Sequence, residues 1–179
     1  MRTPGQLRIK MPREIIHTGR KIKVAVDTSV GPNGETIRRD MILHPGAVVI
    51  LPVIDRDHIC ILKNFRFVIG ETLWEIPAGT LEPGEPIREA AERELLEETG
   101  YTAKKWTYLD YLYASPGVMD EKLHLFVAED LTPGPPCPEA DEQLEPVTLA
   151  WADAMKMALD GTIKDAKTIA ALLLWDRRR

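Results

Sequence analysis

The sequence feature that most constrains the fold is a helical segment over residues 86–99 with strand-like segments on both sides. Pro86 suits its first turn and Gly100 suits a cap at its C-terminal end. This order predicts a mixed α/β fold, an α+β layered domain, rather than regular βαβ winding. We expect strands at 21–29, 35–43, 48–53, 59–64, 74–76, 107–115, 122–129 and 147–150, with two further helices at 151–159 and 165–175.

This helix carries carboxylates on the side that should face a core. At about 100° per residue, Ile87 and Leu95 belong to the apolar side, and Glu94, Glu97 and Glu98 continue it. Carboxylates that converge there repel one another and resist desolvation, so we expect a positive group nearby. The pattern alone allows two interpretations. Either the end of the helix leaves the core and the carboxylates are solvated, or they bind a hard cation.

The residues before the helix favour the cation site. From Gly79 to Tyr101 the segment has the form G-x5-E-x7-R-E-L-x-E-E-x-G-Y. It resembles the Nudix box, G-x5-E-x7-R-E-U-x-E-E-x-G-U, in which U is a bulky aliphatic residue. Every fixed position matches, and Tyr101 departs from the last position only by being aromatic. Agreement at this many spaced positions makes the motif specific.

The resemblance implies a strand, loop and helix that hold divalent metal, Mg²⁺ or Mn²⁺, against a diphosphate. Glu94, Glu97 and Glu98 look like the metal carboxylates, and the backbone carbonyl of Ala78 resembles a main-chain ligand. Glu97 is also a candidate catalytic residue. Metal ions neutralise the charge of a diphosphate and activate a water molecule, which makes this residue set suitable for hydrolysis.

The other fixed positions of the box are expected to be structural. Arg93 and Glu85 resemble an internal ion pair that fixes the loop against the helix, and Gly79 and Gly100 mark the two ends of the motif. The implied fold is a Nudix-type α/β/α sandwich with a mixed central sheet over residues 46–179.

Residues 1–45 are expected to form a small N-terminal antiparallel β-sheet region. A hairpin made only of this segment would be marginal, so it must pack on another part of the protein or on a second subunit. The segment resembles the strands that ADP-ribose pyrophosphatases exchange or pack across a two-fold axis. We therefore expect a homodimer, with the strands swapped or simply packed together.

Residues outside the box resemble the ADP-ribose pyrophosphatase subgroup, which cleaves nucleoside diphosphate sugars. Pro116 falls 15 positions after Tyr101 and is followed by Gly117, as is typical of that subgroup. Arg66 looks like the arginine that meets the diphosphate or terminal ribose, and Glu75 like an acid near substrate and metals. Each residue also has a plainer interpretation. Arg66 can be a surface arginine, Glu75 a turn carboxylate, and Pro116–Gly117 an ordinary turn.

In the subgroup that the chain resembles, the general base often comes from a loop before the last strand, which implies the acidic segment 139–145 here. Glu142 has the best spacing, and Glu139 and Glu145 are rivals, although such a loop can also be merely solvated. No Phe, Trp or Tyr lies between Met1 and Lys63, which departs from the subgroup's usual N-terminal aromatic contact to adenine. The nucleobase and sugar therefore stay open. GDP-mannose is the main rival substrate, and a nucleotide-sensing module without turnover is the alternative of another class.

Composition and charge indicate which partners and which cellular compartment to expect. The net charge is −5, and no basic run exceeds Arg177–Arg179, which argues against nucleic-acid binding. No stretch approaches the ~20 apolar residues of a membrane span, and no secretory signal is visible. Cys60 and Cys137 form no metal or redox motif. We expect a cytoplasmic protein with reduced thiols.

Overall fold

The structure is a computed structural model that describes residues 13–137 and 143–179. The chain forms two compact units by its internal contacts. The first comprises residues up to 45 together with 113–122, and the second comprises 46–112 together with 123–179. The Nudix-box residues all lie in the second unit.

The first unit is built on a three-stranded antiparallel sheet in the order β1-β2-β3. Residues 31–35 close the β2–β3 hairpin, where the Gly31 amide donates to the Glu35 carbonyl at 2.8 Å. Segment 113–122 joins this unit because Ile42 bridges to Met119 and the Asp120 carboxylate accepts from the His44 amide. The strands are β1 (Glu14–Thr18), β2 (Lys23–Val30) and β3 (Thr36–Leu43).

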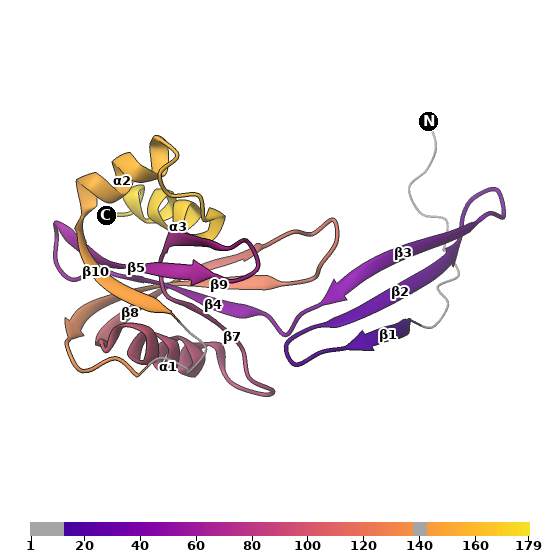
Figure 1. The fold of residues 1–179 in the computed structure, drawn as a ribbon, viewed down its shortest axis with the longest axis horizontal. Coiled ribbons are helices and arrows are strands. Elements are labelled where there is room, and N and C mark those ends of the chain that lie inside the picture. The colour runs from indigo at the N-terminus through magenta and orange to yellow at the C-terminus, as the bar shows by residue number, and fades with distance from the viewer. Residues whose placement is uncertain (1–12, 138–142) are drawn as a thin grey trace. The chain divides into compact units, whose positions relative to one another are not determined.

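The second unit contains two sheets between helices, as Figure 1 shows. One sheet is mixed, in the order β7-β4-β9-β8 with β4 and β9 parallel, and the other is antiparallel, in the order β10-β5-β6. Helix α1 covers one side, and α2 and α3 cover the other (Figure 1). The elements are β4 (Ala47–Pro52), β5 (His58–Arg66), β6 (Glu71–Glu75), β7 (Ala78–Thr80), α1 (Ile87–Thr99), β8 (Thr102–Tyr113), β9 (Lys122–Thr132), β10 (Leu144–Ala150), α2 (Trp151–Leu159) and α3 (Ala166–Asp176).

Strand β4 joins the two hydrophobic layers of this unit. Val48 and Ile50 pack in the cluster under α1, while Val49 and Leu51 pack in the cluster under α2 and α3. Successive side chains of a strand point to opposite faces, so a strand covered on both faces is a continuous apolar run. The predicted α/β/α fold class is confirmed, and the predicted central sheet is divided into a mixed sheet and an antiparallel sheet.

The boundaries differ from expectation where pairing or capping extends an element. Helix α1 begins at Ile87, because Pro86 is its N-cap residue with an extended backbone. Strand β10 begins at Leu144 rather than 147, because its first residues pair with Asn64 and its neighbours on β5. Strand β7 is not among the expected strands, yet Ala78 pairs with Val49.

The two cysteines have different environments. Cys60 is buried in β5, and burial raises the pKa of its thiol to about 12, whereas Cys137 is exposed. Burial disfavours the charged thiolate, so Cys60 behaves as a small apolar side chain. Among the described residues, no helix is both long enough and apolar enough to cross a membrane.

Candidate active site

Strand β7, the loop over 81–86 and helix α1 form one continuous frame. Gly79 of β7 pairs with Val48 of β4, so the frame starts on a fully buried strand. The loop is closed by two bonds between the same residues: the Glu85 amide donates to the Glu82 carbonyl at 3.1 Å, and the Glu82 amide donates to the Glu85 carboxylate at 3.0 Å. The loop is thereby fixed before the helix begins.

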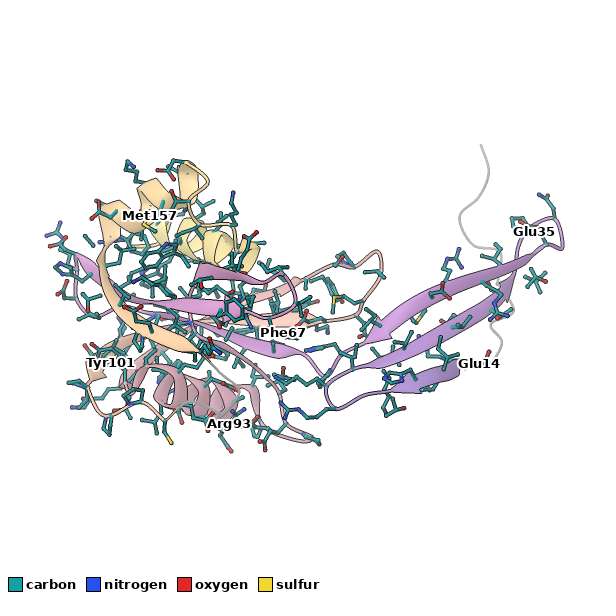
Figure 2. The ribbon with its side chains drawn as sticks, in the orientation of Figure 1. Glu14, Glu35, Phe67, Arg93, Tyr101 and Met157 are labelled. Atoms are coloured by element: carbon teal, nitrogen blue, oxygen red, sulfur yellow. The ribbon has the colours of Figure 1, made fainter. Side chains whose placement is uncertain are left out.

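The Arg93 side chain ties this loop to the helix. Its Nε and Nη2 donate to the two carboxylate oxygens of Glu85 at 2.9 and 3.0 Å. Its Nη1 donates to Glu94 at 2.7 Å and to Glu97 at 3.0 Å. Figure 2 shows Arg93 on α1. The hydrogen bonds from Arg93 hold the pKa of Glu85 below its usual range, and Glu85 in turn raises the pKa of Arg93. One guanidinium therefore bonds to three carboxylates and offsets part of their negative charge.

Glu94 and Glu98 are buried against β7, while the Glu97 side chain is 32% exposed. Glu98 Oε2 accepts from the Ala78 amide at 3.0 Å. The carboxyl group of Glu94 lies where a side chain at Gly79 would begin, because a Cβ there would be 1.8 Å from it. The bare backbone of Gly79 is thus what admits Glu94 to the frame.

The donor set suits a hard divalent cation. Three carboxylates from one helix and the backbone of Ala78 offer oxygen ligands, which Mg²⁺ and Mn²⁺ prefer. Within residues 13–137 and 143–179, no three acidic, histidine or cysteine side chains already stand at mutual metal-binding distances. The cation that bridges Glu94 and Glu97 here is the Arg93 guanidinium. The set therefore attracts positive charge, as a metal site must.

A second charged group lies beside the first. Glu75 is only 1% exposed, and it accepts from Arg66 Nε at 2.7 Å and from Arg66 Nη2 at 2.5 Å. It also accepts from Lys167 Nζ at 2.7 Å. Burial raises the pKa of Glu75, but the bonds from Arg66 and the charge of Lys167 outweigh burial and leave the pKa lowered. The bond to Glu75 raises the pKa of Arg66, and the charge of Glu98 adds to the rise. The two groups are neighbours because Glu75 lies three residues before Ala78, whose amide donates to Glu98 Oε2 at 3.0 Å.

Lys167 was missed by the sequence analysis. It sits in the first turn of α3, where Asp165 is the N-cap residue and accepts from the Thr168 amide. Thr168 in turn accepts from the Ile76 amide at 2.9 Å, which fastens the start of α3 to the residue after Glu75. The available signal in the sequence was the charge of Lys167 two residues after Asp165.

Gly100 serves two purposes at the other end of α1. Its φ of 76° is left-handed, which favours glycine, and its amide donates to the Leu96 carbonyl. A Cβ there would also lie 2.2 Å from the Gly134 carbonyl, so the loop backbone packs directly on this residue. The Cys137 amide donates to the Glu97 carbonyl at 2.9 Å. The loop is therefore fastened to the helix that carries the glutamates.

Of the three candidate general bases, the structure describes only Glu145. Glu142 and its rival Glu139 lie outside the described residues. Glu145 lies in β10, where it pairs with Lys63 of β5 at 3.2 Å. Two residues before Glu145, the Gln143 carbonyl accepts from the amide of Phe65, the neighbour of Arg66 in the sequence.

Pro116 and Gly117 lie in the first unit, in the turn between β8 and β9. The Ser115 carbonyl accepts from the amides of Val118 and Met119, which closes this turn. A Cβ on Gly117 would meet nothing within 4 Å. The substrate contacts expected of Pro116 and Gly117 stay predictions.

Residues 43–172 match the family model described as the NUDIX domain. The chain belongs to the Nudix family. It is a Nudix hydrolase, and members of this family generally need divalent metal. The frame built on β7 and α1 is thus the Nudix box in its folded form.

Named relatives are similar over most of this Nudix chain. It is 42% identical over 162 residues to "ADP-ribose pyrophosphatase" of Bacillus subtilis (strain 168), which covers 89% of this chain and 88% of that protein. It is 34% identical over 154 residues to "GDP-mannose pyrophosphatase" of Yersinia pestis (strain Pestoides F), covering 81% and 77%. The solved "Crystal structure of ADP compounds hydrolase" matches with a TM-score of 0.85 at 26% identity, covering 98% of this chain and 96% of that one.

Replacing Gly100 with alanine should destabilise the protein more than the same change at Gly84. Both glycines have left-handed φ values, 76° and 80°, which cost an alanine roughly 1–2 kcal/mol. Only Gly100 also has backbone atoms in the way of a Cβ. Urea unfolding of Gly100→Ala and Gly84→Ala would measure the difference. Equal losses would mean that the loop does not pack on the helix end in solution.

Proposed function

We propose that the protein hydrolyses the pyrophosphate bond of ADP-ribose or a related nucleoside diphosphate sugar, giving a nucleoside monophosphate and a sugar phosphate. The observation that carries the proposal is the juxtaposition of the Nudix carboxylates with Arg66. Arg66 bonds to Glu75, which lies three residues before Ala78, and the Ala78 amide donates to Glu98. A cation beside a metal-type carboxylate set suits a diphosphate, which needs positive charge on several oxygens at once. The names of the relatives support the same substrate class.

The proposed roles follow from position and exposure. Glu94, Glu97 and Glu98, with the Ala78 carbonyl, would hold Mg²⁺ or Mn²⁺, and the metal would supply charge neutralisation and water activation. Arg66, with a side chain 43% exposed, would bind diphosphate oxygens while Glu75 orients it from the buried side. Arg66 thus keeps one side free to face a ligand.

The reaction itself is a substitution at phosphorus. A water oxygen bonds to one phosphorus, the bond from that phosphorus to the bridging oxygen breaks, and the bridging oxygen leaves with the other phosphate. A carboxylate takes the proton of the water. We propose Glu142 as this base. Support comes from the described residues on either side of Glu142. The Cys137 amide donates to the Glu97 carbonyl, and the Gln143 carbonyl accepts from the amide of Phe65, the residue before Arg66.

The substrate class is tested by phosphate release, after coupling to a phosphatase, from ADP-ribose, GDP-mannose, UDP-glucose and diadenosine polyphosphates. We expect ADP-ribose to lead with Mg²⁺ and turnover to stop with EDTA. Leading turnover of GDP-mannose, which the Yersinia relative's name favours, would keep the chemistry and replace the substrate. Glu98→Gln should lower kcat by at least about a hundredfold if the carboxylate is a metal ligand.

The same assay separates an enzyme from a nucleotide-sensing module. A sensor would bind ADP-ribose, as measured by calorimetry, without hydrolysing it. Glu97→Gln would then have no turnover to abolish. Wild-type turnover abolished by that change would exclude the sensor.

The base is tested by Glu142→Gln, with Glu139→Gln and Glu145→Gln beside it. Loss of a general base costs roughly 10²–10⁴ in rate, mainly in kcat. We expect that loss at Glu142 alone, since Glu145 is paired with Lys63. A loss confined to Glu139→Gln or Glu145→Gln would move the role there.

We also propose that the protein is a homodimer through its N-terminal sheet, in a cytoplasmic setting. The small three-stranded sheet over β1 to β3 supports the dimer, because so small a sheet needs packing from elsewhere. Two free cysteines fit a reducing compartment. Light scattering should give the mass of two chains, and a monomer at micromolar concentration would exclude the dimer. Cell fractionation would check the location.

A further inference from the structure

The buried carboxylate of Glu75 is held by two cations that come from distant parts of the chain. Arg66 reaches it from the end of β5 and Lys167 from the first turn of α3. Both cations bond to the same oxygen, Oε2, at 2.5 Å from Arg66 and at 2.7 Å from Lys167. Two cations therefore face two anions here, because Lys167 also bonds to the Asp165 carboxylate, and the contribution of each cation to Glu75 has to be weighed.

The two cations differ in their freedom. The Arg66 side chain is 43% exposed, whereas the Lys167 side chain is 12% exposed and also bonds to Asp165 at 2.9 Å. Asp165 is itself fixed as the N-cap residue of α3. Arg66 can therefore turn its outer side to a ligand, while Lys167 stays with Glu75.

This difference matters when Arg66 meets an anion. A guanidinium shared between Glu75 and a diphosphate gives less of its charge to Glu75, which lies at 1% exposure with little access to water. An uncompensated buried carboxylate would draw Arg66 back and oppose substrate binding. Lys167 lowers that cost, because it stays bonded to Glu75 and Asp165 when Arg66 turns to a ligand and so keeps a positive charge beside Glu75.

We propose that Lys167 is a positioning residue that neutralises Glu75 and so makes Arg66 available to the substrate diphosphate. The inference rests on the proposed function, because it assigns Arg66 to the diphosphate. It adds a residue that touches neither substrate nor metal and that acts through Glu75 and Arg66.

The test is a double-mutant cycle on ADP-ribose hydrolysis with Lys167→Met and Arg66→Met. Alone, Lys167→Met should raise KM about tenfold and change kcat by less than about twofold, because the loss lies in substrate binding. In the Arg66→Met background it should have little further effect on kcat/KM. Lys167→Arg should keep most of the affinity, and Lys164→Met, on an exposed lysine three residues earlier, serves as the matched control.

An equal loss of kcat/KM from Lys167→Met in both backgrounds would overturn the proposal, because it would mean that Lys167 does not act through Arg66. A fall in kcat at unchanged KM would do the same. If Lys167→Met fails to fold, Lys167→Gln takes its place in the cycle.

A second measurement needs no substrate and stands if the proposed function fails. The charges that bear on Glu75 are Arg66 and Lys167, with Asp165 and Glu98 as neighbouring anions. The lowered pKa of Glu75 contributes stability above its ordinary pKa, and this stability is lost as pH falls through the lowered value. Removing Lys167 should raise that pKa and move acid unfolding to higher pH. An unchanged acid transition in Lys167→Met would overturn the link, whereas absence of turnover in the wild type would overturn only the substrate.

Discussion

The guanidinium of Arg93 is the contact on which the candidate site depends. Three acidic side chains, Glu85, Glu94 and Glu97, converge on it, and two of them come from the same helix face. Without that charge the carboxylates would repel one another at a partly buried surface, and the loop before the helix would lose its attachment. The same residue thus sets the loop, orients the helix carboxylates and keeps their negative charge from destabilising the fold.

The frame around Arg93 is held in place by strand β4, whose register is fixed by burial on both faces. Every residue of β4 is buried, with alternate side chains in the two hydrophobic layers. A register slip of one residue would exchange the two sets of side chains between layers of different shape. Gly79 pairs with this strand and admits the Glu94 carboxyl, so the position of that carboxyl is set by the core.

Local features of the site and fold could be predicted from the sequence, and distant ones could not. The spacing of Glu94, Glu97 and Glu98 and the cap at Gly100 depend on neighbours within one helix, where periodicity and turn preference apply. The contact of Lys167 with Glu75 joins residues 92 positions apart, and the packing of Gly134 on Gly100 joins two loops. No local pattern encodes either. Strand β7 was not predicted, because three residues are too few to show an alternation of apolar and polar side chains.

The packing of the loop on Gly100 has a consequence for motion. The Cys137 amide and the Gly134 backbone contact the last turn of α1, the turn that contains Glu97 and Glu98. The loop cannot leave this position without releasing the Glu97 carbonyl and exposing the helix end. Opening of the loop and fraying of the helix therefore belong to one cooperative event. Any movement of this loop would therefore also act on the last turn of α1, where Glu97 and Glu98 lie.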